Sequence, residues 1–142
     1  MIRAGRSHEI CAGHRIFGHE GKCAHLHGHA YVFDFVVAAE PEQPALDTLG
    51  RVIDFAIIKS TLCQWLEKNW DHRMLLWEND PILHSLRKLD PDGIVALPLN
   101  PTAENLARIM VESVGPMVLR GTGVHLVECT VHETGKCWAV AS

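Results

Sequence analysis

Histidines are the first residues of this sequence whose type and spacing indicate chemistry. The chain holds ten among 142 residues, and five lie within sixteen consecutive positions: His14, His19, His25, His27 and His29. If the stretch that starts at His27 forms a strand, His27 and His29 point to the same side, about 6–7 Å apart, and both can reach one ion. His14 supplies a third nitrogen if the strand that it ends is a neighbour. Three neutral imidazoles that leave one position open are typical of catalytic zinc.

Two other interpretations of these residues stay open. A His-x-His pair can be no more than the polar start of a strand. Four residues could also close a structural zinc site: Cys11, His14, Cys23 and His27. Cys11 and His14 have opposite strand parity, however, and a chain of this length can bury a core without a metal. His19 and His25 are interpreted as surface residues.

A thiol and an Asp-His pair are the candidates for proton transfer. Cys23 follows Lys22 in a turn four residues before His27. A neighbouring cation and a nearby metal favour the thiolate, although Lys22 could equally be a solvated loop charge. Asp71 could orient the ring of His72 and stabilise its charged form. Because adjacent residues on an extended chain point apart, this pairing depends on the tertiary structure.

Glu133 is a candidate for ligand recognition. It closes a strand face that is otherwise apolar, with Val127, Cys129 and Val131 at the same parity. A carboxylate in such a place costs free energy unless it finds donors, and a ligand with an N–H and an amino group side by side would provide two. The alternative is a strand-end glutamate that reaches water. Glu104 has a simpler explanation as a favourable charge in the first turn of a helix.

Hydrophobic periodicity predicts the elements that position these residues. Period-2 or β-rich stretches predict strands at residues 2–14, 27–39, 124–133 and 137–141, and apolar residues three and four apart predict helices at 54–69 and 101–114. Gly115-Pro116 should break or kink the second helix. The expected fold class is α+β, as one domain over residues 1–142 with two helices on one face of an antiparallel sheet. The open sheet edges and second face favour oligomerisation.

Composition narrows the function classes. Lys and Arg number 13 against 17 Asp and Glu, a net charge of −4, which argues against a general nucleic-acid binder. No apolar run approaches the roughly 18 residues of a membrane span, and the N-terminal residues do not resemble a signal peptide. Five irregularly spaced cysteines are typical of free thiols in a reducing compartment. A cytoplasmic protein without a membrane or nucleic-acid partner is expected.

Several motifs together carry a family resemblance. In chain order they are Ala12-Gly13-His14-Arg15, Lys22-Cys23-Ala24-His25-Leu26-His27-Gly28-His29, Gly50-Arg51-Val52-Ile53-Asp54-Phe55, Asp71-His72, Pro101-Thr102-Ala103-Glu104-Asn105 and Glu133-Thr134. The chain resembles the 6-pyruvoyltetrahydropterin synthase / 6-carboxytetrahydropterin synthase family. The step from Cys23 to His27 and the pair Asp54-Phe55 look like the bacterial carboxy branch. Arg51 stands where the family usually has a methionine.

The resemblance implies an architecture and a site. It implies the tunnelling fold, a four-stranded antiparallel sheet with two helices on one face, assembled as a homohexamer of two trimers. It implies a Zn²⁺ ion with His14, His27 and His29 as its ligands. Proton transfer is implied for Cys23, Asp71 and His72, and contact with the pterin for Glu133, Thr102 and Glu104.

The resemblance also implies a reaction. The substrate would be 7,8-dihydroneopterin triphosphate, and the products 6-carboxy-5,6,7,8-tetrahydropterin, acetaldehyde and triphosphate, in queuosine and deazapurine biosynthesis. Such an enzyme is a carbon-carbon lyase. The alternatives are 6-pyruvoyltetrahydropterin formation by triphosphate elimination and a non-catalytic zinc-binding homologue. Lys22, Arg15 and Lys136 are the candidates for holding the triphosphate.

Overall fold

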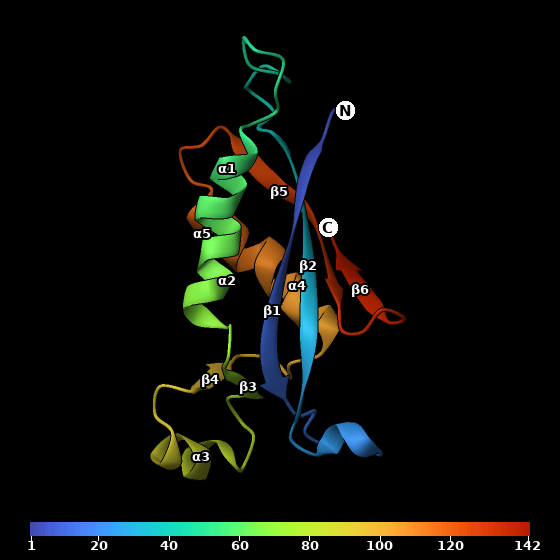
Figure 1. Cartoon of the computed structure of the whole chain (residues 1–142), viewed down its shortest axis with the longest axis vertical. Helices are drawn as coiled ribbons and strands as arrows, with labels where there is room; N and C mark the ends of the chain where they lie inside the picture. The colour runs from blue at the N-terminus through green and yellow to red at the C-terminus, as the bar shows by residue number, and fades with distance from the viewer.

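Two long antiparallel strands form the spine of the molecule. A computed structural model describes residues 1–142. In it β1 (Ala4–His14) pairs with β2 (His27–Ala39) along its whole length, with Ala4 opposite Val37 and His14 opposite His27 (Figure 1). The two predicted strands are therefore confirmed. Their register sets the ends of both strands, and the histidines there, side by side.

The complete sheet has six strands, in the order β4-β3-β1-β2-β5-β6. β5 (Val124–His132) and β6 (Trp138–Ala141) extend it antiparallel beyond β2, as the sequence predicts. β3 (Met74–Trp77) and β4 (Ile94–Leu97) extend it on the other side, parallel to β1 and to each other. The prediction of a four-stranded antiparallel sheet is thus wrong: the sheet is mixed and larger. The extra strands were missed because four-residue strands inside a parallel pair lack the alternation that marks a half-buried strand.

The first helical stretch begins at Asp54, whose side chain accepts a hydrogen bond from the N–H of Ala56. It runs as α1 (Phe55–Ile58), a π-helical turn (Lys59–Cys63) and α2 (Gln64–Asn69). This confirms the helix predicted at 54–69. Asp54 acts as the N-cap, as expected for a short polar side chain with one free acceptor oxygen.

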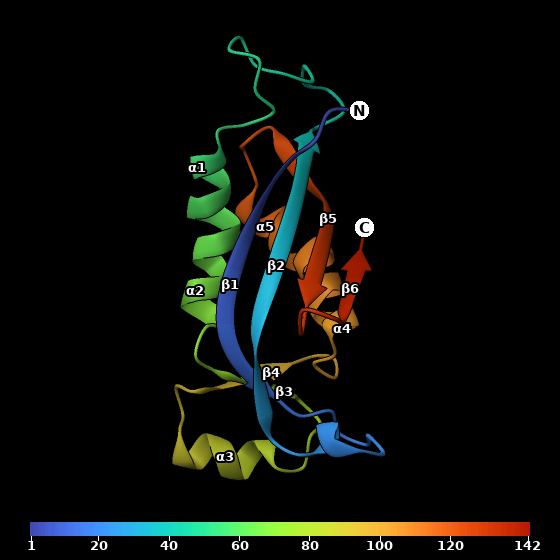
Figure 2. The same ribbon diagram turned by 45° about the vertical axis from the view of Figure 1, so that its right-hand side comes forward.

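The second helical stretch passes through the glycine and proline that were expected to break or kink it. α4 (Ala103–Ile109) leads into a π-helical turn (Met110–Val114) and then α5 (Gly115–Val118). The wider turn comes just before Pro116, which has no N–H to donate, so the helix continues with a change of pitch. A short helix, α3 (Leu83–Leu89), joins β3 to β4 at the far end of the molecule (Figure 2).

Both long helical stretches contribute to one core on the same face of the sheet. The core contains 24 buried residues, including Leu62 and Leu66 from the first stretch and Leu106 and Met110 from the second. On β2 the predicted inward parity is confirmed, because four alternate side chains are at most 1% exposed: Tyr31, Phe33, Phe35 and Val37. Each such burial contributes about 1.5–3 kcal/mol to folding.

β5 changes face at a β-bulge. Val36 lies opposite Glu128 whereas Val37 lies opposite Leu126, so Val127 is left without a partner in the register. The core residues of β5 are consequently Val124 and Leu126 before the bulge and Cys129 and Val131 after it. The expectation that Val127 shares the face of Cys129 is wrong, since one extra residue inverts the parity. None of the helices is long and apolar enough to cross a bilayer.

Candidate metal centre and surrounding residues

Four side chains from three strand ends converge on one point. His14 ends β1, His27 and His29 begin β2, and Glu133 directly follows β5. One donor atom from each lies within 4.8 Å of the other three, an arrangement that could hold a metal ion. The two predicted strands bring the three imidazoles together, because in their antiparallel register His14 is the direct partner of His27.

Backbone carbonyls fix two of the rings. Nδ1 of His14 donates to the carbonyl oxygen of Pro101 at 2.7 Å, and Nδ1 of His27 donates to that of His25 at 2.7 Å. A carbonyl oxygen can only accept, so the proton sits on Nδ1 and each Nε2 presents a lone pair. The two Nε2 atoms lie 3.0 Å apart. Two lone pairs at this separation repel each other unless a cation lies beside them, and outer carbonyl contacts of this kind are typical of metal-bound histidines.

The electrostatics of the cluster favour the neutral form of two of the rings, His14 and His29. Burial lowers the pKa of His14 against the effect of the Pro101 carbonyl, and burial also lowers the pKa of His29 against the attraction of Glu133. The His14 side chain is only 1% exposed. Neutral imidazole is the form that binds metals, so the lowered pKa values of these two rings favour metal binding. A zinc-type donor set of three nitrogens fits the residues present.

Asp71 and His72 form the pair that the sequence alone left unresolved. Oδ2 of Asp71 accepts from Nδ1 of His72 at 2.8 Å, and Oδ1 accepts from the N–H of Cys11 at 3.0 Å. The pairing is possible because His72 has a left-handed backbone with φ of 58°, held by its N–H bond to the Cys11 carbonyl. Burial would raise the pKa of Asp71, but the hydrogen bonds from His72 and Cys11 outweigh it and lower that pKa.

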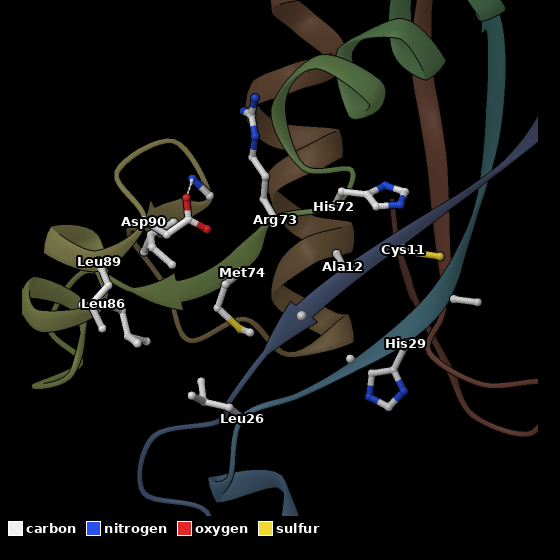
Figure 3. Close-up of a pocket in the computed structure, with 15 residues that line it drawn as sticks. Cys11, Ala12, Leu26, His29, His72, Arg73, Met74, Leu86, Leu89 and Asp90 are labelled. Atoms are coloured by element: carbon white, nitrogen blue, oxygen red, sulfur yellow. Dashed lines mark hydrogen bonds between the residues drawn. The ribbon is translucent and has the colours of Figure 1, made fainter.

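The His72 ring is 79% exposed and faces an open cleft of about 640 Å³. The cleft lies between the ends of β1 and β2 and the helix α3, and Figure 3 shows His72 and His29 on its wall. Gly13 and Gly28 line the cleft and have no side chains to fill it. Leu86 and Leu89 of α3 form the opposite wall.

Cys23 does not contact the Asp-His pair within one chain. It lies in a turn of 3-10 helix (Lys22–Ala24) between β1 and β2 and is half-buried. Its carbonyl oxygen accepts from the N–H of Ile16 at 2.8 Å, which ties the turn to the residues just after β1. The thiol makes no hydrogen bond to Asp71 or His72. The structure therefore brings the histidines together but leaves the two proton-transfer candidates apart.

The remaining predicted residues lie at the start of α4, at the end of β1, in the turn that begins at Lys22, and between β5 and β6. Oγ1 of Thr102 caps α4 by accepting from the N–H of Asn105 at 3.1 Å, and Glu104 is exposed in the first turn. Arg15 is not a free cation for a triphosphate, since its guanidinium is bound by the buried carboxylate of Asp80. Lys22 and Lys136 are exposed.

Sequence reasoning missed two features of this region. Pro101 enters through its carbonyl oxygen, which no side-chain pattern reveals. Asp80 lies in a segment for which no helix or strand was predicted. The one available signal was Arg15 beside His14, a cation that needs a carboxylate partner if it is buried. Glu133 was found, but as a ligand-binding residue and not as a donor within reach of His14 and His29.

Comparisons with known proteins show the family of this chain. A family model described as 6-pyruvoyl tetrahydropterin synthase matches residues 4–142. A 6-carboxy-5,6,7,8-tetrahydropterin synthase of Rickettsia felis is 35% identical over 139 residues, which cover 97% of this chain and 98% of that protein. The enzyme of the same name from Haemophilus influenzae is 26% identical, over 78% of this chain and 79% of its own.

Solved structures show the same fold. An uncharacterized protein of Wolinella succinogenes superposes with a TM-score of 0.81 at 19% identity, over 99% of this chain and 97% of that one. The 6-pyruvoyl tetrahydropterin synthase of Caenorhabditis elegans superposes with a TM-score of 0.70 at 24% identity, over 99% and 94% of the two chains.

Proposed function

Because the chain belongs to the 6-pyruvoyl tetrahydropterin synthase family, we propose that it converts 7,8-dihydroneopterin triphosphate to 6-carboxy-5,6,7,8-tetrahydropterin, with release of acetaldehyde and triphosphate. This would make it a carbon-carbon lyase of queuosine and deazapurine biosynthesis. The relatives named for the carboxy product, at 33–35% identity in several organisms, support this branch. The observation that carries the proposal is the convergence of three imidazoles, two of which present an Nε2 lone pair because Nδ1 donates to a backbone carbonyl.

We propose that His14, His27 and His29 hold a Zn²⁺ ion. When bound, such an ion supplies Lewis acidity toward the hydroxyl groups of the substrate side chain. The protein's part is to present neutral nitrogens in fixed orientations. The carbonyls of Pro101 and His25 do so for two of the three rings.

Proton transfer is assigned to the chain's own thiol and imidazole. The Cys23 thiolate takes a proton from the substrate side chain, and His72 returns or relays protons, as general acid-base groups do. Asp71 holds the His72 ring by Nδ1, which leaves Nε2 for the proton that is exchanged. The carboxylate of Glu133 accepts from the guanidine-like edge of the pterin, with Thr102 and Glu104 near the ring.

An assembly of several copies is also proposed. β3 pairs with β1 only at Gly13 and His14, so residues 4–12 have a strand partner on one side alone, and β6 ends the sheet on the other side. The sheet face opposite the long helices bears no helix from the same stretches (Figure 2). These edges support a homohexamer of two trimers in the cytoplasm, where the five free cysteines stay reduced.

The decisive experiment is product identification. Zinc-loaded protein is incubated with 7,8-dihydroneopterin triphosphate, acetaldehyde is trapped as a hydrazone, and the pterin product is weighed by mass spectrometry. The proposal expects equal amounts of acetaldehyde and carboxypterin. A pyruvoyl product without acetaldehyde would support the alternative that the family name and the Caenorhabditis elegans structure suggest. No turnover by protein that binds zinc and substrate would indicate a non-catalytic homologue.

The role of Cys23 has its own test. Cys23→Ala should lower turnover by about 10²-fold or more while zinc stoichiometry stays the same. Cys137→Ala is the matched control, because that free thiol lies in the turn before β6. Full turnover by Cys23→Ala would show that the base is another group.

A further inference from the structure

Glu133 stands in an unusual relation to two of the imidazoles. Its Oε1 lies 2.9 Å from Nε2 of His29 and 3.3 Å from Nε2 of His14. Despite this proximity, Nε2 of His29 is buried and has no hydrogen-bond partner, so the contact lacks the alignment of a hydrogen bond. A carboxylate oxygen and an imidazole nitrogen that lie this close without a shared proton can both act as ligands of one cation.

Three of the donor separations are compatible with ligands of one ion. Zinc bonds to nitrogen and oxygen of about 2.0–2.1 Å in a tetrahedron separate neighbouring donors by about 3.3 Å. The observed separations are 3.0 Å between His14 and His27, 3.3 Å between His14 and Glu133, and 2.9 Å between His29 and Glu133. The carboxylate therefore lies where it would be a fourth ligand, at the position that the sequence left open in a three-histidine site.

The four donors differ in how firmly they are held. Carbonyl oxygens fix the rings of His14 and His27 through Nδ1. The carboxylate of Glu133 contacts only His14 and His29, and its side chain is 25% exposed, against 1% and 18% for these two rings. Its backbone N–H donates to the Cys137 carbonyl, so the backbone is held while the side chain can change its rotamer. Glu133 is the donor that can leave.

We propose that Glu133 is an exchangeable fourth metal ligand, which closes the metal in the resting protein and is drawn away when a pterin ring binds. This inference rests on the proposed function, because it uses the pterin as the competing partner. The N–H and amino group of the ring edge offer the carboxylate two charge-assisted hydrogen bonds. The corner that Glu133 leaves then becomes open to the side chain of the same substrate molecule. Recognition of the ring would thus precede access to the metal.

The test replaces zinc with Co²⁺, whose visible absorption reports the number and type of its ligands. Addition of 6-methyl-7,8-dihydropterin, which has the ring but no hydroxylated side chain, should change the Co²⁺ spectrum of the unaltered protein. In Glu133→Gln the starting spectrum should differ, and the same pterin should leave it unchanged. Glu133→Gln should also weaken Zn²⁺ binding about 10- to 100-fold in competition with a chromophoric chelator. Glu128→Gln, in the strand β5 that Glu133 follows, is the control and should match the unaltered protein.

The outcomes separate this inference from the proposed function. If Glu133→Gln has the Co²⁺ spectrum and the Zn²⁺ affinity of the unaltered protein, Glu133 is not a ligand and the inference is wrong, whatever the acetaldehyde assay gives. If Glu133→Gln weakens Zn²⁺ binding but the pterin leaves the spectrum of the unaltered protein unchanged, Glu133 is a permanent ligand and the exchange is refuted. If Glu133→Gln leaves the Co²⁺ spectrum and the Zn²⁺ affinity unchanged and the unaltered protein also shows no turnover, the inference and the proposed function are both wrong.

Discussion

Arg15 and Asp80 bind the end of β1 to the turn before α3. Nε of Arg15 donates to Oδ2 of Asp80 at 2.7 Å, and Nη2 donates to Oδ1. The carboxylate is fully buried and also accepts from the N–H of Ile82 at 3.0 Å. Because Arg15 directly follows His14, this ion pair holds the chain at the point where it leaves the metal cluster.

Removal of the buried carboxylate should be costly. Asp80→Asn leaves the Arg15 guanidinium without its partner in a largely desolvated place, so the free energy of unfolding should fall by about 3 kcal/mol. Urea unfolding followed by circular dichroism measures this. Arg108→Gln is the control, because Arg108 and Glu112 are more than half exposed and their pair should contribute about 0–1 kcal/mol. Equal stability of Asp80→Asn and the unaltered protein would show that the pair is not structural.

The same pair predicts a dependence on pH. Burial would raise the pKa of Asp80, but the Arg15 hydrogen bonds outweigh it and lower that pKa below its ordinary value of 3.8. A carboxyl with a lowered pKa contributes stability that is present above its unfolded pKa and is lost as the pH falls through its folded pKa. The stability difference between the unaltered protein and Asp80→Asn should thus be full at pH 7 and shrink below about pH 4. A difference that stays constant down to pH 2.5 would contradict this assignment.

Gly28 separates the two histidines of β2 and is opposite Gly13 on β1. A Cβ at Gly28 would lie 3.0 Å from the carbonyl oxygen of Ala12 and 3.5 Å from Cα of Gly13, so the two backbones would have to part. Because His14 and His27 are held in register by this pairing, Gly28→Ala should weaken Zn²⁺ binding by about tenfold. Gly135→Ala, where an added Cβ meets no atom within 4 Å, should leave the affinity unchanged.

Asp71→Asn tests the second half of the proposed proton transfer. The amide can still accept from the Cys11 N–H, but it cannot stabilise a charged His72 ring, so turnover should fall by about 10²-fold. Zn²⁺ affinity should not change, since neither Asp71 nor His72 is among the four converging donors. The control is Asp47→Asn, an exposed carboxylate paired with Arg51. Unchanged steady-state kinetics in Asp71→Asn would remove the pair from the mechanism.

Sequence patterns predicted the elements that carry long, regular signals. The alternation from Tyr31 to Val37 identified the inward face of β2, and that parity also placed His27 and His29 on one side. A capping residue marked the helix start at Asp54, and the second helix, expected from residue 101, begins two residues later at Ala103. These signals are local, so a single sequence is enough to detect them.

What could not be predicted depends on contacts between distant segments. β3 and β4 are short and pair in parallel, so their only signal is a run of apolar residues. The bulge at Val127 arises from the pairing of β5 with β2 and leaves no mark in the composition. The roles of Pro101 and Asp80 become visible only when the end of β1 meets residues more than sixty positions away.

The wall formed by α3 is separable from the rest of the molecule. None of the 24 core residues lies between Trp77 and Ile94, although Leu86 and Leu89 line the cleft beside His72. Selection can therefore remodel this wall, in sequence or in length, with little penalty to folding as long as Asp80 is retained. The boundary of the cleft is a site where specificity can diverge among descendants while the scaffold beneath stays the same.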